Sequence, residues 1–134
     1  MLATLLAGVL VARHGAAQLP PPETTATTMV FDPGTSQRFA IPDCVPRRAD
    51  EASREACRTL TQVLRADLRF EGLFRFVPDE LMAAIKPLDP ERPDFTDWRG
   101  VGASHLVVVQ AQVSGEDLQV DAKVYFPETG QTIL

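Results

Sequence analysis

The sequence has few of the residues on which catalytic and metal sites depend. It contains two histidines and two cysteines among 134 residues. Nucleophilic catalysis needs a serine, cysteine or threonine within reach of a base, and a structural zinc site needs closely spaced cysteines and histidines. His14 and His105 are far apart in the chain, and no glycine-rich phosphate loop lies between a strand and a helix. We therefore expect no enzyme activity, no catalytic residue, no cofactor and no metal, and we interpret His105 as a strand end rather than a base.

Basic residues are also few. Thirteen lysines and arginines oppose eighteen aspartates and glutamates, which gives a formal net charge of −5. The basic residues are dispersed, and Arg47 and Arg48 form their only adjacent pair. Nucleic acids and anionic membranes are bound through basic patches, so the charge argues against both kinds of partner.

The chain also has no hydrophobic run long enough to cross a membrane. The run Leu2–Ala12 has eleven residues, too few for a transmembrane helix but typical of the core of a signal peptide. Small residues at positions 15–17 follow it and predict cleavage after Ala17, with export of a chain that has no transmembrane anchor. The alternative is a buried or frayed helix, because no basic residue precedes the run.

Residues 18–35 have the composition of a flexible tail. Three consecutive prolines and several threonines fill most of it, and such a composition disfavours a packed element. Met29, Val30 and Phe31 form a short apolar run within this polar stretch. If the tail binds a partner, these three residues are the expected anchors for adding a strand to the partner's sheet.

The two cysteines allow two interpretations. In an oxidising compartment Cys44 and Cys57 are able to pair, whereas in the cytosol they would stay thiols. Without a disulfide, Cys57 would be a small buried hydrophobe beside the helix stripe and Cys44 an unrelated loop thiol. The spacing of the two residues does not decide between these interpretations.

The stretch from Leu60 to Phe76 organises the rest of the chain. A helix beginning after Asp50, its predicted N-cap, carries one apolar stripe and stops near Gly72. The stripe consists of Ala56, Leu60, Val63, Leu64 and Leu68. Leu73 begins an apolar strand directly after the glycine, so the chain folds back onto the stripe.

The remaining segments predict further strands and short helices. Strands are expected at 37–43, 106–113, 118–126 and 131–134, short helical segments at 78–85 and after Asp94, and a loop at 45–49. Residues 118–126 alternate apolar and polar without a break, which predicts a half-buried antiparallel strand. Trp98 is expected to be a core anchor.

The pattern predicts an α/β fold of the α+β type, a two-layer sandwich of a mixed β-sheet with one long and one or two short helices. The domain, residues 36–134, is expected to be incomplete at its C-terminal end, where the element that would cover the rest of the sheet is missing.

Four segments together resemble the amino-terminal domain of the TolB family. They are FAIPD (Phe39–Asp43), RADLRFEGLFRFV (Arg65–Val77), PDFTDWRGVGASHLVVVQ (Pro93–Gln110) and LQVDAKVYFPETGQTIL (Leu118–Leu134). The resemblance implies an α/β domain on a mixed sheet, normally followed by a β-propeller, and no enzyme activity. It also implies the periplasm of a Gram-negative bacterium and the Tol–Pal system, which serves protein import, envelope integrity and cell division.

The resemblance also implies partners. In the family the N-terminal segment binds the C-terminal domain of TolA, a place occupied here by the tail with Met29, Val30 and Phe31. The propeller binds the lipoprotein Pal, so Pal is not expected as a partner of a chain without the propeller. We expect a fragmentary or truncated adaptor of this system. The alternative is a stand-alone secreted binding domain with another partner or ligand, and the reading frame beyond Leu134 discriminates the two.

Overall fold

The computed structural model describes residues 37–133, which form three helices and six strands. In chain order they are β1 (Arg38–Ala40), β2 (Val45–Pro46), α1 (Glu51–Phe70), β3 (Arg75–Phe76), α2 (Asp79–Ala83), α3 (Phe95–Gly100), β4 (His105–Ser114), β5 (Asp117–Phe126) and β6 (Gln131–Thr132). All six strands belong to one sheet with the order β3-β1-β4-β5-β6, and β2 pairs with β4 beyond the end of β1.

The sheet is mixed, as predicted. β1 is parallel to both β3 and β4, and β2 is also parallel to β4. The long hairpin of β4 and β5 is antiparallel and in register from Leu106 opposite Tyr125 to Ser114 opposite Asp117. β6 continues the antiparallel part beside the end of β5. The observed architecture confirms the predicted fold class, one mixed sheet with one long and two short helices.

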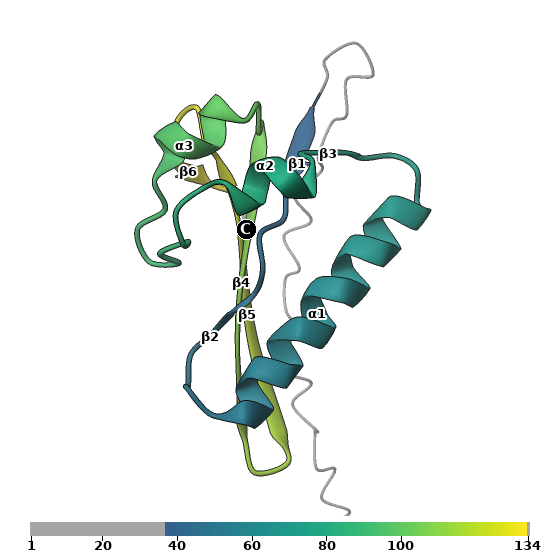
Figure 1. Ribbon diagram of the computed structural model, residues 1–134, viewed down its shortest axis with the longest axis vertical. Helices are drawn as coiled ribbons and strands as arrows, with labels where there is room; N and C mark the ends of the chain where they lie inside the picture. Colours follow the sequence, from purple (N-terminus) through teal and green to yellow (C-terminus); the bar gives the residue numbers. More distant parts are fainter. Residues whose placement is uncertain (1–36, 134) are drawn as a thin grey trace, which may run out of the picture. The chain divides into compact units, whose positions relative to one another are not determined.

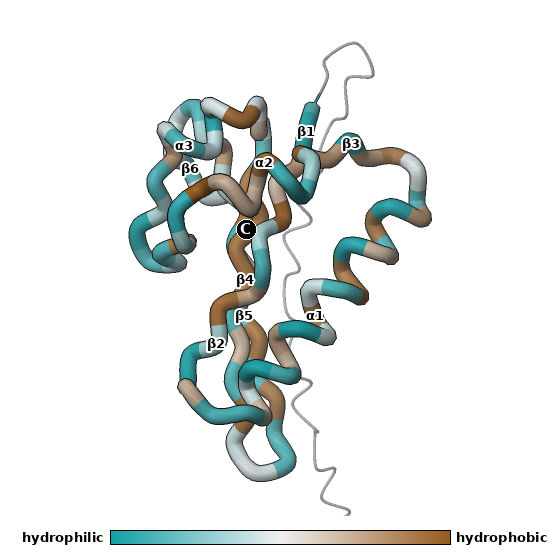
Figure 2. The backbone as a smooth tube through the Cα atoms, in the orientation of Figure 1, coloured by the Kyte–Doolittle hydropathy of each residue, from teal (hydrophilic) through white to brown (hydrophobic). Residues whose placement is uncertain are grey.

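The two faces of the sheet carry separate clusters of buried side chains. α1 lies on one side of the hairpin and α3 on the other (Figure 1), and side chains of both α2 and α3 belong to the cluster opposite α1. Val107, Val109 and Ala111 of β4 point into the cluster beneath α1, while Leu106 and Val108 point into the opposite cluster. Figure 2 accordingly shows β4 as hydrophobic over most of its length and α1 as mixed. Trp98, 2% exposed, anchors the second cluster, as the sequence predicted.

The ends of α1 follow the signals in the sequence. The carboxylate of Asp50 accepts the backbone N–H of Ser53 at 2.8 Å, which confirms Asp50 as the N-cap. Beyond the C-terminal end, Gly72 has φ +66°, a left-handed conformation that strains residues with a Cβ atom. The chain therefore turns at the glycine and enters the sheet as β3 a few residues later.

Two local predictions were wrong. The first strand ends at Ala40 instead of residue 43, because Pro42 has no N–H and the N–H of Cys44 donates to a side chain of α1. Residues 45–49 were expected to be a loop, yet Val45–Pro46 form β2 beside Gln110 and Ala111. The following residue, Arg47, donates its backbone N–H to the carbonyl of Ala111 at 2.9 Å, which extends this pairing.

Candidate interaction site

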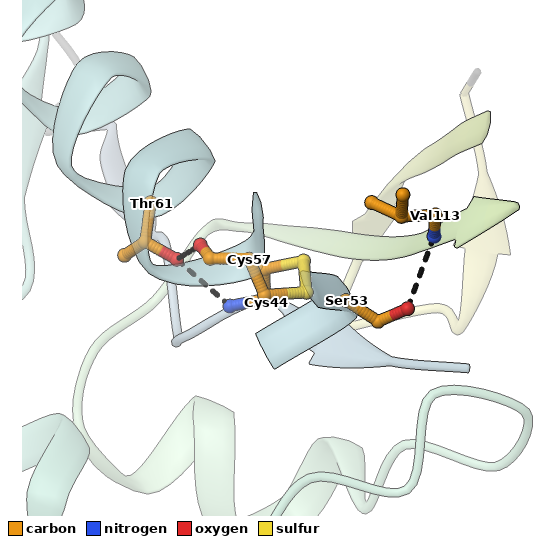
Figure 3. Close-up of a disulfide and its surroundings, with 5 residues drawn as sticks. All are labelled: Cys44, Ser53, Cys57, Thr61 and Val113. Atoms are coloured by element: carbon orange, nitrogen blue, oxygen red, sulfur yellow. Dashed lines mark hydrogen bonds between the residues drawn. A yellow bond between two sulfur atoms is a disulfide. The ribbon is translucent and has the colours of Figure 1, made fainter. Parts of the chain in front are cut away.

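The predicted site residues fall in two regions. Met29, Val30 and Phe31 lie outside the described residues. Cys44 and Cys57 are joined by a disulfide, with their Cα atoms 5.0 Å apart, which ties the loop after β1 to the second turn of α1 (Figure 3). Of the two interpretations left open by the sequence, the structure has the disulfide, and no free cysteine occurs among residues 37–133.

Two hydroxyl groups of α1 reinforce this junction. The hydroxyl of Thr61 accepts the backbone N–H of Cys44 at 2.9 Å and donates to the carbonyl of Cys57 at 3.0 Å (Figure 3). The hydroxyl of Ser53, which is fully buried, accepts the N–H of Val113 at 3.0 Å. The N-terminal half of α1 is therefore fixed both to the loop and to β4.

A depression of about 440 Å³ lies over the disulfide, and three arginine side chains line part of it. Arg65 donates twice to the carbonyl of Ile41, at 2.6 and 2.9 Å, and pairs with Asp43 at 3.1 Å. Arg54 and Arg58 both pair with Glu51, each at 2.9 Å. Arg58 also pairs with Glu55, so three carboxylates face the three guanidinium groups. Among the described residues the depression therefore has no excess positive charge with which to hold an anion.

The adjacent pair Ser104 and His105 superficially resembles a nucleophile and its base, since Oγ and Nδ1 are 3.0 Å apart. The serine hydroxyl accepts the N–H of Arg38 at 2.8 Å and lies 3.1 Å from the Arg38 carbonyl. The imidazole of His105 is buried and stacked on Phe39 at 4.4 Å, with Phe126 at 4.9 Å. Burial lowers the pKa of His105. The pair fastens β1 to β4, and no third group within residues 37–133 is hydrogen-bonded to the ring to orient it as a base.

Metal-binding clusters and membrane-spanning helices are both absent from the described part of the chain. Residues 37–133 contain no group of three or more histidine, cysteine, aspartate or glutamate side chains that could hold a metal ion. Among the same residues, none of the helices is both long and apolar enough to cross a membrane.

An apolar strip on β5 is exposed on the surface of the described residues. Alternate side chains of this strand point toward the face that carries α1, yet α1 packs on β4 and β2 and leaves several of them open. We call this strip the open strip; it consists of Leu118, Val120, Ala122 and Phe126. Leu118 and Val120 are 51% and 49% exposed, so the prediction of a half-buried β5 was wrong for this end of the strand.

A hollow of about 160 Å³ lies between the open strip and α1. Its walls are almost entirely apolar and come from three elements and a loop: Leu60 and Leu64 of α1, Val109 of β4, Val120 and Ala122 of β5, and Ile41. The alternation in the sequence marks these positions as the core face of a strand, but it does not show which of them the helix reaches.

Comparison with known proteins places this architecture in a family. The sequence profile described as the TolB amino-terminal domain matches residues 33–126. The Tol-Pal system protein TolB of Ruegeria sp. is 32% identical over 99 residues, covering 71% of this chain and 21% of the relative. Its namesake in Roseobacter denitrificans is 31% identical over 88 residues, covering 65% and 19%. The chain thus spans about a fifth of the length of these curated relatives.

Solved structures share the fold at low sequence identity. The LpoB C-terminal domain from Salmonella enterica aligns with a TM-score of 0.56 and 18% identity, covering 74% of this chain and 78% of that domain. TolB from Acinetobacter baumannii aligns with a TM-score of 0.52 and 16% identity, covering 76% of this chain and 22% of that protein. The profile match extends over most of the described residues, from before β1 to the end of β5. The chain therefore belongs to the TolB amino-terminal domain family.

Proposed function

We propose that this chain is a non-enzymatic adaptor of the Tol–Pal system in the periplasm, where it serves envelope integrity and cell division. The observation that carries the proposal is the family match over residues 33–126, together with curated relatives that are named as Tol-Pal system proteins. An adaptor acts through its surfaces, and the described residues present an open apolar strip instead of a reactive centre.

The proposed route to the periplasm is the N-terminal segment. Residues 1–17 act as a signal peptide with cleavage after Ala17, residues 18–35 form the tail, and residues 36–134 form the domain. Mass spectrometry of the protein recovered from the periplasm should give a mature chain beginning at Gln18. An intact Met1 on the recovered protein would contradict the cleavage.

The proposed partner is the C-terminal domain of TolA, bound through the tail. Met29, Val30 and Phe31 are three apolar residues in a polar stretch, which suits a strand that pairs through its backbone and inserts alternate side chains. β1 follows the tail in the sequence, and Ser104 fixes it by accepting the N–H of Arg38 at 2.8 Å.

The test is isothermal titration calorimetry of the mature chain with the TolA C-terminal domain of the same organism. Val30→Ser combined with Phe31→Ser should abolish the binding heat, because a polar strand loses its apolar anchors. Thr27→Ser combined with Thr28→Ser is the matched control and should bind as the parent does. Unchanged affinity of the Val30/Phe31 variant would show that these anchors are not used. If the parent chain does not bind, TolA is not its partner, and the alternative of a stand-alone secreted binding domain with another partner or ligand is favoured.

A further inference from the structure

The disulfide between Cys44 and Cys57 lies at an opening in the surface of the domain (Figure 3). Both cysteines line the depression of about 440 Å³, although the two residues are only 7% and 4% exposed. This volume falls within the roughly 300–1,000 Å³ of small-molecule sites, so the depression has room for a small thiol. Thiol–disulfide exchange requires a thiolate to reach one of the two sulfur atoms. The depression gives such a thiolate a route to the disulfide of the folded domain.

The segment between β1 and β2 is also attached to α1 by contacts that do not need the disulfide. Arg65 donates twice to the carbonyl of Ile41, at 2.6 and 2.9 Å. The hydroxyl of Thr61 accepts the N–H of Cys44 at 2.9 Å, and β2 pairs with β4 directly after this segment. Reduction of the S–S bond therefore leaves the segment in place, with the two thiols side by side.

The reduced chain would have a single way to close again. The sequence contains two cysteines, so no third thiol competes for either of them. Because both thiols are held on the same folded domain, their reoxidation is intramolecular and has a high effective concentration. The bond can therefore open and close repeatedly without mispairing.

The charges beside the two sulfur atoms decide which of them is attacked. Arg54 and Arg58 flank Cys57 on α1 and line the depression, whereas the carboxylate of Asp43 adjoins Cys44. Guanidinium groups favour a neighbouring thiolate and carboxylates disfavour one. The sulfur whose thiolate is better stabilised is the better leaving group, so Cys44 is attacked and Cys57 leaves. The carboxylates that pair with both arginines make this preference small.

We propose that the Cys44–Cys57 disulfide is a redox-sensitive site that exchanges with a dithiol while the domain stays folded. In the first step a thiolate of the dithiol attacks Sγ of Cys44, a new S–S bond forms, and Cys57 leaves as the thiolate. In the second step the other thiolate of the dithiol attacks its own sulfur that is bonded to Cys44. This attack releases Cys44 and leaves the dithiol as a disulfide. Two electrons pass from the dithiol to the protein, and its two thiol protons reach the cysteines through solvent.

The exchange site does not depend on the proposed binding of TolA, because none of its residues belongs to the tail. Reduction and reoxidation are also measured on the chain alone, without a partner. A failure of either proposal therefore leaves the other untouched.

The test is reduction of the parent chain by dithiothreitol, stopped with iodoacetamide and followed by mass spectrometry. Gly72→Ala is the matched variant, because Gly72 has φ +66° beyond the C-terminal end of α1 and a Cβ there meets nothing within 4 Å. Alanine at this position destabilises the whole domain through backbone strain and leaves the depression unchanged. Exchange from the folded state should proceed at the same rate in both proteins. Exchange that requires unfolding would be about five- to thirtyfold faster in Gly72→Ala.

Reduced thioredoxin replaces dithiothreitol in a parallel experiment. Faster reduction by thioredoxin at equal thiol concentration identifies a protein dithiol as the donor, and slower reduction identifies a small dithiol.

The reduced protein should keep its fold at room temperature. Trp98, the one tryptophan of the sequence, is 2% exposed and reports on packing through near-ultraviolet circular dichroism. Its signal should be unchanged after complete reduction, and oxidised dithiothreitol should restore the disulfide. Cys44→Ala combined with Cys57→Ala is the control and should respond to neither reagent.

Reduced glutathione, a monothiol, should trap the first step as a mixed disulfide when the reaction is stopped with acid. Trypsin separates Cys44, in the peptide 39–47, from Cys57, in the peptide 55–58. Glutathione should be found on Cys44 at least about twice as often as on Cys57.

Three results would overturn the inference. One is reduction of Gly72→Ala that is faster by the factor expected for unfolding. Another is loss of the Trp98 signal when the parent is reduced, because the disulfide would then be required for the fold. The third is glutathione found mainly on Cys57, which would reverse the assigned direction of attack.

Discussion

The hydroxyl of Thr61 accepts the backbone N–H of Cys44 at 2.9 Å, across seventeen residues of chain. It also donates to the Cys57 carbonyl at 3.0 Å, so it uses its donor and one acceptor position within the disulfide junction. The N–H of Cys44, in the gap between β1 and β2, therefore bonds to a helix side chain. Residues 41–44 can then leave the sheet without leaving the buried N–H of Cys44 unpaired.

Replacing Thr61 with valine should destabilise the oxidised protein by about 1–3 kcal/mol, because the buried N–H of Cys44 loses its acceptor. Valine has nearly the same shape, so the packing of α1 is retained. Thr61→Ser keeps the hydroxyl and should cost less. Urea unfolding followed by circular dichroism measures both changes, and equal stability of Thr61→Val and the parent would show that the bond contributes nothing.

The disulfide itself should contribute about 3 kcal/mol, the amount expected for closing a loop of this size in the unfolded chain. Cys44→Ala combined with Cys57→Ala should lower the stability by that amount. Dithiothreitol should lower the melting temperature of the parent and leave that of the double variant unchanged. A parent whose melting temperature does not respond to complete reduction, verified by thiol titration, would contradict this prediction.

The sequence predicted the elements whose signals are local. Asp50 and Gly72 mark the ends of α1 because capping and left-handed turns depend on a few neighbouring atoms. The β4–β5 hairpin follows from the unbroken alternation of residues 118–126 and the apolar run that begins β4. β2 was missed because two residues carry no periodicity, and Val45 pairs with Gln110 only because β4 has a free edge beyond β1.

The candidate site was harder to predict for a different reason. Val109 and Val120 both occupy apolar positions of an alternating strand, yet Val109 is buried under α1 and Val120 is half-exposed. Alternation identifies the face of a strand, whereas exposure depends on which long-range element covers it. One long helix was expected to cover only part of the sheet, and α1 leaves Val120 of β5 half-exposed. The position of the open strip on β5 follows only from the order of the strands in the sheet.

Acidification should destabilise the protein through His105. Burial lowers the pKa of its imidazole below the ordinary value of 6.5. Between the two pKa values the unfolded chain binds more protons than the folded one, so the free energy of unfolding falls as the pH drops from 7 through 6.5. His105→Phe keeps an aromatic ring against Phe39 and should remove this dependence.

The measurement is urea unfolding at intervals from pH 7.5 to about 5.5, a range above the ordinary titration of carboxylates. The pKa of Asp50 is lowered mainly by its hydrogen bond from the N–H of Ser53, so the cap loses stability only at more acidic pH. The parent should lose stability over this range relative to His105→Phe. Parallel curves for the two proteins would show that His105 does not cause the loss.

Two glycines with the same backbone conformation should differ in their response to alanine. Gly72 and Gly130 have φ of +66° and +69°, so alanine at either position costs about 1–2 kcal/mol of strain. A Cβ at Gly72 would meet nothing within 4 Å, whereas one at Gly130 would lie 3.3 Å from the ring of Phe95. That ring packs against Tyr125 at 5.4 Å and is not free to withdraw. Gly130→Ala should therefore lower the unfolding midpoint more than Gly72→Ala.

Combining Gly130→Ala with Phe95→Leu should reduce the difference, because the smaller side chain removes the contact. If the two single variants unfold at the same urea concentration, the close approach of Phe95 has no energetic consequence.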